Sequence, residues 1–244
     1  MEIFYPIVKF FTAGGAFMFP ILLVAAVATA IAVERYVTLT RLSAKNRRAW
    51  AQVEPVLAKG DFDKAREMTS KDDADVSRLL GMGLALQGAV RRRDDVEKAM
   101  QESMMEIIPQ LEKRTHYLAT FANLATLLGL LGTVSGLIHA FGAVANVNPA
   151  EKANLLSSSI SEAMNCTAFG LVTAVPILFV HAFLQTKTTQ VVDGLETAAI
   201  KYLNALAARQ AARALSRLEI AQTGPVAQTE SPVGAVPVAH AAQA

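Results

Sequence analysis

The stretch NLLSSSISEAMNCTAFGLVTAVPILFVHAF, residues 154–183, decides the fold. A helix needs about 20 predominantly apolar residues to cross the hydrocarbon core of a bilayer, and this stretch exceeds that length. It also contains Glu162, and no other charged residue lies between Lys152 and Lys187. Because a charge inside a membrane span is costly, Glu162 points to a specific role in the function or the assembly of the protein.

The composition also indicates an integral membrane protein. Of the 244 residues, 52% are hydrophobic and 18% are charged, whereas ordinary soluble domains carry about 25% charged residues. The charge is concentrated between Thr38 and Arg114, which holds about 15 of the 23 Lys and Arg residues. The single cysteine, Cys166, excludes an intramolecular disulfide and a cysteine-based zinc site, and we expect no metal and no cofactor. The net charge of +2 is too small to indicate a nucleic-acid partner.

Two more uncharged segments predict two more spans. The first is residues 10–33, about 24 residues in which Pro20 falls in the first turns, where its missing N–H costs little. A cleaved signal peptide is the alternative, but the apolar run is too long and basic residues follow it. The second segment, residues 115–150, is longer than one crossing requires, so its helix extends past the bilayer or ends in an apolar loop. The sequence NVNPAEK, residues 146–152, then predicts a tight turn.

The distribution of basic residues predicts the topology. Lys9 is the only basic residue before the first span, so the positive-inside rule places the charged segment in the cytoplasm and the N-terminus on the other side of the membrane. Three crossings return the C-terminus to the cytoplasm. The predicted organisation is a periplasmic N-terminus (1–12), a first span (13–37), a cytoplasmic helical region (38–115), a second span (116–145), a periplasmic loop (146–153), a third span (154–186), a cytoplasmic helix (187–220) and a disordered tail (221–244).

The cytoplasmic segment carries helical signals. Asp61 follows Gly60 and is placed to cap a helix. Apolar residues at spacings of three and four predict one packed helix face, made of Val96, Met100, Met104, Ile107, Ile108 and Leu111. We interpret the run from Arg91 to Arg93 as a solvated turn.

The second and third predicted spans each carry a stripe of small and polar residues. In the second, the stripe consists of Thr126, Gly129, Thr133, Gly136 and Ala140, and Gly132 forms a small-xxx-small pair with Gly136. Glycines at such spacings indicate close packing of helices in lipid. In the third, the stripe consists of Ser158, Glu162, Cys166, Phe169 and Thr173, so the carboxyl lies on the polar side of its helix.

Three roles for Glu162 follow from this position. A carboxyl that gains and loses a proton in a polar stripe is suited to passing protons, because desolvation favours its neutral form. The alternatives are a structural carboxyl that bridges two helices, or one that lies near the outer interface, since Glu162 is only roughly 11 Å past the start of the apolar run.

The residues IIPQLEKRTHYLATFANLATLLGLLGTVSGLIHAF (107–141) and ISEAMNCTAFGLVTAVP (160–176) resemble the MotA/TolQ/ExbB proton channel family, and within it the ExbB/TolQ branch. The sequence KGDFDKAREM (59–68) is similar to the cytoplasmic helices of the same proteins, and the resemblance covers about residues 10–205. The chain departs from the common pattern at Thr126, Ser135 and Ser159, where many members have proline, tryptophan and glycine. His139 matches a pattern of TolQ and some ExbB proteins, and we interpret it as a hydrogen-bonded packing residue.

The resemblance implies the fold and the assembly. It implies an all-α inner-membrane protein with three transmembrane helices, in which long second and third helices extend into a cytoplasmic helical bundle, and a homopentameric channel. An ExbD- or TolR-like single-span protein would occupy the pore, and a TonB- or TolA-like protein would receive the work. Carried onto this sequence, the pore-lining residues on the proton pathway are Glu162, Thr167 and Thr133, with Gly129, Gly132 and Gly136 for helix packing.

The predicted function is that of the proton-channel scaffold of an ExbB–ExbD-type motor, which uses the proton gradient to energise TonB-dependent outer-membrane transport. The alternatives are a TolQ-type component of the Tol-Pal envelope system and a non-conducting assembly scaffold. An enzyme is not expected, because the sequence lacks a GxSxG motif, a P-loop and a cluster of His and Glu ligands.

Overall fold

The computed structural model describes residues 14–86, 93–145 and 147–222, and all regular structure in these ranges is helical. The helices are α2 (Met18–Ala58), α3 (Phe62–Ser70), α4 (Asp75–Leu86), α5 (Arg93–Glu112), α6 (Thr115–Val144) and α7 (Pro149–Gln222). Three stretches are long and apolar enough to cross a membrane, namely α2, the consecutive helices α5 and α6, and α7. The predicted all-helical class with three membrane-length apolar helices is therefore confirmed.

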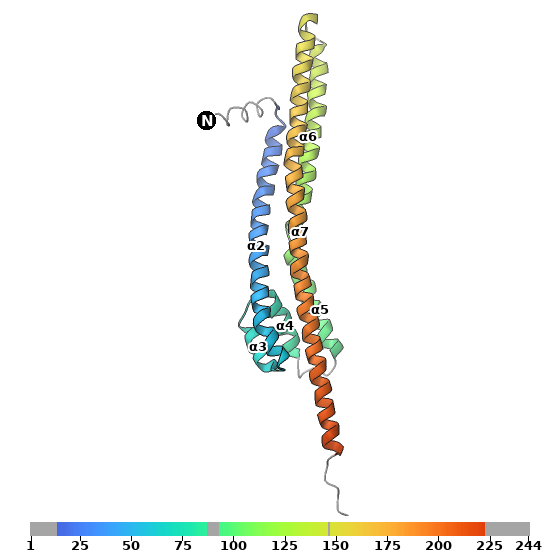
Figure 1. Ribbon diagram of the computed structural model, residues 1–244. Coiled ribbons are helices and arrows are strands. Elements are labelled where there is room, and N and C mark those ends of the chain that lie inside the picture. The colour runs from blue at the N-terminus through green and yellow to red at the C-terminus, as the bar shows by residue number, and fades with distance from the viewer. Residues whose placement is uncertain (1–13, 87–92, 146, 223–244) are drawn as a thin grey trace, which may run out of the picture.

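The described chain forms an elongated molecule (Figure 1). Helices α6 and α7 pair along the length of α6 and project past the first residues of α2, which lies alongside them. The short helices α3, α4 and α5 gather around the C-terminal half of α2 and the middle of α7, and α7 then continues beyond them. The apolar and the charged parts of the sequence thus occupy opposite ends of the molecule.

Helix α2 does not end where the first apolar segment ends. It begins at Met18, with Pro20 in its first turn as expected, and runs without a break to Ala58, well past the predicted limit of the span at residue 37. Gly60 then adopts a positive φ of 76°, and Asp61 Oδ1 accepts the backbone N–H of Lys64 at 3.1 Å. The predicted cap of α3 by Asp61 is confirmed.

The second long helix is interrupted close to the predicted boundary between the cytoplasmic helical region (38–115) and the second span (116–145). Helix α5 ends at Glu112 and α6 begins at Thr115, after Arg114 has taken a left-handed conformation with φ of 67°. The Arg114 guanidinium donates to the Glu34 carboxylate at 3.0 Å, which ties this corner to α2. A non-glycine residue adopts this conformation only where the surrounding contacts determine it.

Helix α7 is longer than the predicted third span at both ends. It begins at Pro149 rather than at residue 154, because proline suits the first position of a helix, where no N–H is required. It also passes through residues 186 and 187 without a boundary, so the predicted span and the predicted cytoplasmic helix are one element. The predicted N-terminal segment (1–12), almost all of the predicted tail (221–244), and Arg91 and Arg92 lie outside the described residues.

Two hydrophobic cores hold the described helices together. One core joins α2, α6 and α7 in the apolar half, around Ile21, Leu118 and Leu184. The other joins α2 to α5 with α7 in the charged half, and within it the predicted face of α5 is buried at Val96 and Met100. In the apolar half many large side chains remain exposed on the single chain, such as Phe179 (76%), as expected for a surface that meets lipid or other protein.

Candidate functional site

The contact between α6 and α7 is made by small residues. A Cβ atom at Gly129 would lie 3.3 Å from the Cα atoms of Thr167 and Gly170. A Cβ at Gly136 would lie 2.9 Å from Ala163 Cβ, and one at Gly132 would collide with the Cys166 sulfur. The three glycines of the second predicted span therefore face α7 of the same chain, and their missing side chains allow the two backbones to approach closely.

This close approach permits a hydrogen bond across the pair. The Thr167 hydroxyl donates to the Gly129 carbonyl oxygen at 2.8 Å. A side chain at position 129 would press against the α7 backbone at Thr167. It would therefore disturb the geometry of this hydrogen bond. The Thr133 hydroxyl instead donates to the Leu130 carbonyl of its own helix at 2.6 Å. The two threonines assigned by resemblance are thus both hydrogen-bonded, but only Thr167 links α7 to α6.

Glu162 lies on an exposed face of α7 and lines a pocket of about 380 Å³. The polar residues of this pocket are Ser135, His139, Ser159 and Glu162. The first turn before α2 closes one side of it, because a Cβ at Gly15 would collide with the Glu162 carboxylate. Gly15 has a positive φ of 75°, so the absence of a side chain serves both the backbone conformation and the approach of the carboxyl.

His139 belongs to the same pocket rather than to a packed interface. Its Nδ1 lies 2.8 Å from the Ser135 carbonyl oxygen, so this nitrogen carries the proton and donates it. The second ring nitrogen, Nε2, then remains available as an acceptor. The predicted hydrogen bonding of His139 is present, whereas the imidazole is exposed on the single chain instead of being packed.

No cation in the described ranges forms an ion pair with Glu162. The nearest charged residues along α7 are Lys152 and Lys187, roughly 15 Å and 37 Å away at the helical rise of 1.5 Å per residue. Thr133 and Thr167 are not among the described residues that line the Glu162 pocket. In the single chain the three residues therefore lie on the same helix pair without sharing one cavity.

Sequence reasoning did not find Gly15 as a neighbour of Glu162, and it did not join Ser135 and His139 to the carboxyl. The departures from the common family pattern at Ser135 and Ser159 were visible in the sequence, and both residues line the pocket. Ser135 on α6 could have been linked to Glu162 on α7 by asking which hydroxyls of the second span face the third. Nothing in the sequence marks Gly15 as its contact.

Three apolar helices of membrane length and a carboxyl within one of them define a multi-pass α-helical membrane protein with an ionisable group inside the span. The family model of the MotA/TolQ/ExbB proton channel family matches residues 72–197. The chain belongs to this family, in its ExbB/TolQ branch. It is a multi-pass inner-membrane protein and a proton-channel-type component of energy transduction.

Relatives carry both names of the branch. The chain is 31% identical over 192 residues to the biopolymer transport protein ExbB-like 1 of Synechocystis, an alignment that covers 75% of this chain and 72% of the relative. It is 34% identical over 94 residues to the Tol-Pal system protein TolQ of Haemophilus influenzae, covering 38% of this chain and 41% of the relative. It is 29% identical over 119 residues to the biopolymer transport protein ExbB of Xanthomonas campestris, covering 48% and 44%.

Proposed function

We propose that this chain is the proton-channel scaffold of an ExbB–ExbD-type motor in the inner membrane, and that it uses the proton gradient to energise TonB-dependent outer-membrane transport. The observation that carries the proposal is the Glu162 carboxyl, which lies inside a membrane-length helix, in a polar pocket, with no ion-pair partner among the described residues. A carboxyl that only stabilised the fold would be expected to have a partner for its charge.

The scaffold works as a homopentamer around an ExbD- or TolR-like single-span helix, with its N-terminus in the periplasm and its C-terminus in the cytoplasm. Large apolar side chains that are exposed on the single chain, such as Ile138 (67%) and Phe141 (65%), supply surfaces for neighbouring copies, the partner or lipid. Thr167 and Thr133 lie on the proton pathway with Glu162. Gly129, Gly132 and Gly136 set the spacing of the helices that carry these groups.

One proton that crosses a potential of about 100 mV releases about 2.3 kcal/mol. This energy is of the same order as one or two hydrogen bonds. A mechanical stroke that rearranges a helix interface therefore needs several protons. In an oligomer, the carboxyl of each copy provides one proton-binding site, so several protons can be bound in turn during one stroke.

The proposal is tested by removing the ionisable proton while keeping the shape. Glu162→Gln is expected to leave folding and oligomer assembly intact but abolish gradient-driven uptake, because an amide hydrogen-bonds without ionising. Glu162→Asp is expected to retain part of the activity, because it keeps the acid and shortens the reach by one methylene. Uptake and oligomer mass are measured side by side, with Thr133→Val and Thr167→Val expected to weaken uptake without changing the oligomer.

The matched control is Glu151→Gln, which makes the same chemical change in the exposed first turn of α7. Its uptake should equal that of the unmodified protein. A carboxyl that merely bridges helices predicts the reverse ranking, with Glu162→Gln nearly normal and Glu162→Asp poorly assembled. A fully active Glu162→Gln variant refutes the proton-carrier role.

A TolQ-type role in the Tol-Pal envelope system is the second candidate, and the match to the Haemophilus protein favours it as much as the ExbB matches favour the first. Complementation separates the two. A strain that lacks its ExbB would regain uptake of iron complexes under the leading proposal. A strain that lacks its TolQ would regain detergent resistance under the alternative.

A further inference from the structure

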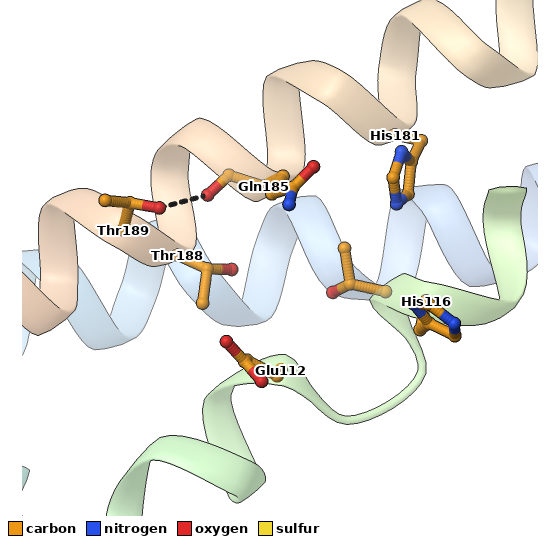
Figure 2. Close-up of a pocket in the computed structure, with 7 residues that line it drawn as sticks. Glu112, His116, His181, Gln185, Thr188 and Thr189 are labelled. Atoms are coloured by element: carbon orange, nitrogen blue, oxygen red, sulfur yellow. Dashed lines mark hydrogen bonds between the residues drawn. The ribbon is translucent and has the colours of Figure 1, made fainter.

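A second polar pocket lies at the other end of the α6–α7 pair from Glu162. It has a volume of about 160 Å³ and is lined by Glu112, Thr115, His116, His181, Gln185, Thr188 and Thr189. Figure 2 shows the two imidazoles on different helices, His116 on α6 and His181 on α7, together with Glu112 at the end of α5. Two of the four histidines of the chain thus line one pocket.

One buried hydroxyl in this pocket, that of Thr115, lacks a partner within the described ranges for a hydrogen bond that water could supply. The Thr115 side chain is 5% exposed, and its hydroxyl has no hydrogen-bond partner among the described residues. The hydroxyls of Thr188 and Thr189 are already bonded to the carbonyls of Leu184 and Gln185. At about 30 Å³ per molecule the pocket has room for about five waters, and one of them would satisfy Thr115.

The pocket lies where the apolar half of the molecule meets the charged half, on the side that the proposed topology makes cytoplasmic. His181 follows Glu162 by 19 positions on one continuous helix, which corresponds to roughly 28 Å, close to the thickness of a hydrocarbon core of about 30 Å. Glu112 lines the pocket itself, Lys113 and Arg114 lie three and two positions before His116, and Lys187 follows His181 by six positions on α7. The Glu34 carboxylate bonds Arg114 at 3.0 Å and lies 3.6 Å from Arg35.

Polar side chains lead from the pocket into the span along α6. Thr120 and Asn123 follow His116 at spacings of four and three, so the three residues share one face, and all three are exposed on the single chain. An amide inside the hydrocarbon region is stable only where it meets water or protein. This face is therefore covered by a partner or by water in the assembly, and it continues the pocket toward the level of Glu162.

We propose that His116 and His181 form the cytoplasmic proton-acceptor site of the channel, an inference that rests on the proposed function. A proton arriving on pocket water forms a bond to the lone pair of an imidazole nitrogen, and the resulting imidazolium returns the proton to cytoplasmic water. Imidazole is suited to both steps because it is the side-chain type that exchanges protons near neutral pH.

The ligand assigned to the site is a proton carried by water rather than a metal ion. Across the described ranges, no group of three His, Cys, Asp or Glu side chains is arranged to hold a metal. Glutamine is the informative substitution, because it keeps a hydrogen-bonding group and loses the capacity to titrate. Alanine leaves a space that free imidazole can enter.

The test measures proton flux with a pH-sensitive dye in membrane vesicles that contain the full-length chain and its single-span partner. His116→Gln and His181→Gln are each expected to lower the flux, and the double variant to lower it by about 100-fold, the lower end of the usual size of general acid–base effects. Adding imidazole on the cytoplasmic side should restore flux to the His116→Ala variant. The control is Thr186→Ala, which removes an exposed hydroxyl on the same part of α7. In the described part of the chain this hydroxyl bonds only the Ala182 carbonyl of its own helix, so the proton flux of the variant should equal that of the unmodified protein.

Two outcomes separate this inference from the proposed function. If Glu162→Gln retains full flux, the proposed function fails and the acceptor site fails with it. If Glu162→Gln abolishes flux while the double histidine variant conducts normally between about pH 6 and 8, only the acceptor site is refuted.

Histidine labelling covers the case in which the variants fail to fold. Diethyl pyrocarbonate should modify His116 and His181 of the unmodified protein in membranes, because the pocket is aqueous. Absence of labelling at both residues would overturn the inference.

Discussion

Replacing Gly170 with alanine is expected to push α6 and α7 apart at the site of their closest approach. An added Cβ would lie 2.8 Å from the Ala125 carbonyl oxygen and 3.1 Å from Gly129 Cα, both of which are backbone atoms. An ordinary contact of a Cβ begins at 3.4 Å, so the two backbones must separate by about 0.6 Å. No side-chain rotation can relieve a contact with backbone.

The free energy of this change can be bounded. Inserting a methyl group into a packed interface costs about 1–3 kcal/mol. A separation of about 0.6 Å also stretches the 2.8 Å bond between Thr167 and Gly129 beyond the usual range, at a cost of about 0.6 kcal/mol in a membrane protein. The better helix propensity of alanine returns about 1 kcal/mol. The net destabilisation is about 0.6–2.6 kcal/mol, or roughly 1–10 °C in the unfolding temperature.

The assay is thermal unfolding of the purified protein in mild detergent, with Gly194→Ala as the matched control. Gly194 lies on the same helix, and no described atom would come within 4 Å of its added Cβ, so this variant should gain about 1 kcal/mol from helix propensity alone. The unfolding temperature should therefore fall for Gly170→Ala and rise for Gly194→Ala. Equal or higher stability of Gly170→Ala would refute the tight α6–α7 contact.

Two further predictions concern the cytoplasmic core and the topology. Burial raises the pKa of Tyr202 to about 12, with a smaller opposing effect from Arg209, so the neutral phenol stabilises the fold below about pH 10 and this contribution is lost as the pH rises toward 12. Because the buried hydroxyl of Tyr202 has no partner among the described residues, Tyr202→Phe should match the unmodified protein in unfolding temperature near neutral pH. Above about pH 10 the variant should lose less stability than the unmodified protein. Identical stability profiles at alkaline pH would contradict this. Reporter fusions after Arg48 and after Lys187 should both read as cytoplasmic and one after Asn148 as periplasmic, whereas a periplasmic signal at Arg48 would break the three-span arrangement.

Local features of this protein were determined by the sequence itself. The number of membrane-length helices follows from the lengths of uncharged segments, which are properties of contiguous residues. The cap of α3 by Asp61 and the buried face of α5 follow from spacings within one or two turns. The family likewise follows from motifs that lie within single helices, which is why residues 107–141 and 160–176 together indicate it.

The contacts between helices were decided only by the tertiary structure. Periodicity places Glu162 on the polar side of α7, but it does not reveal that Gly15 closes on the carboxyl or that His116 and His181, 65 positions apart in sequence, line the same pocket. The break at Arg114 and the continuous run of α2 to Ala58 likewise depend on packing between separate elements, including the ion pair of Arg114 with Glu34. The physical reason is that helical repeats fix the direction in which a side chain points, whereas the group it meets depends on which helix packs opposite and at what height.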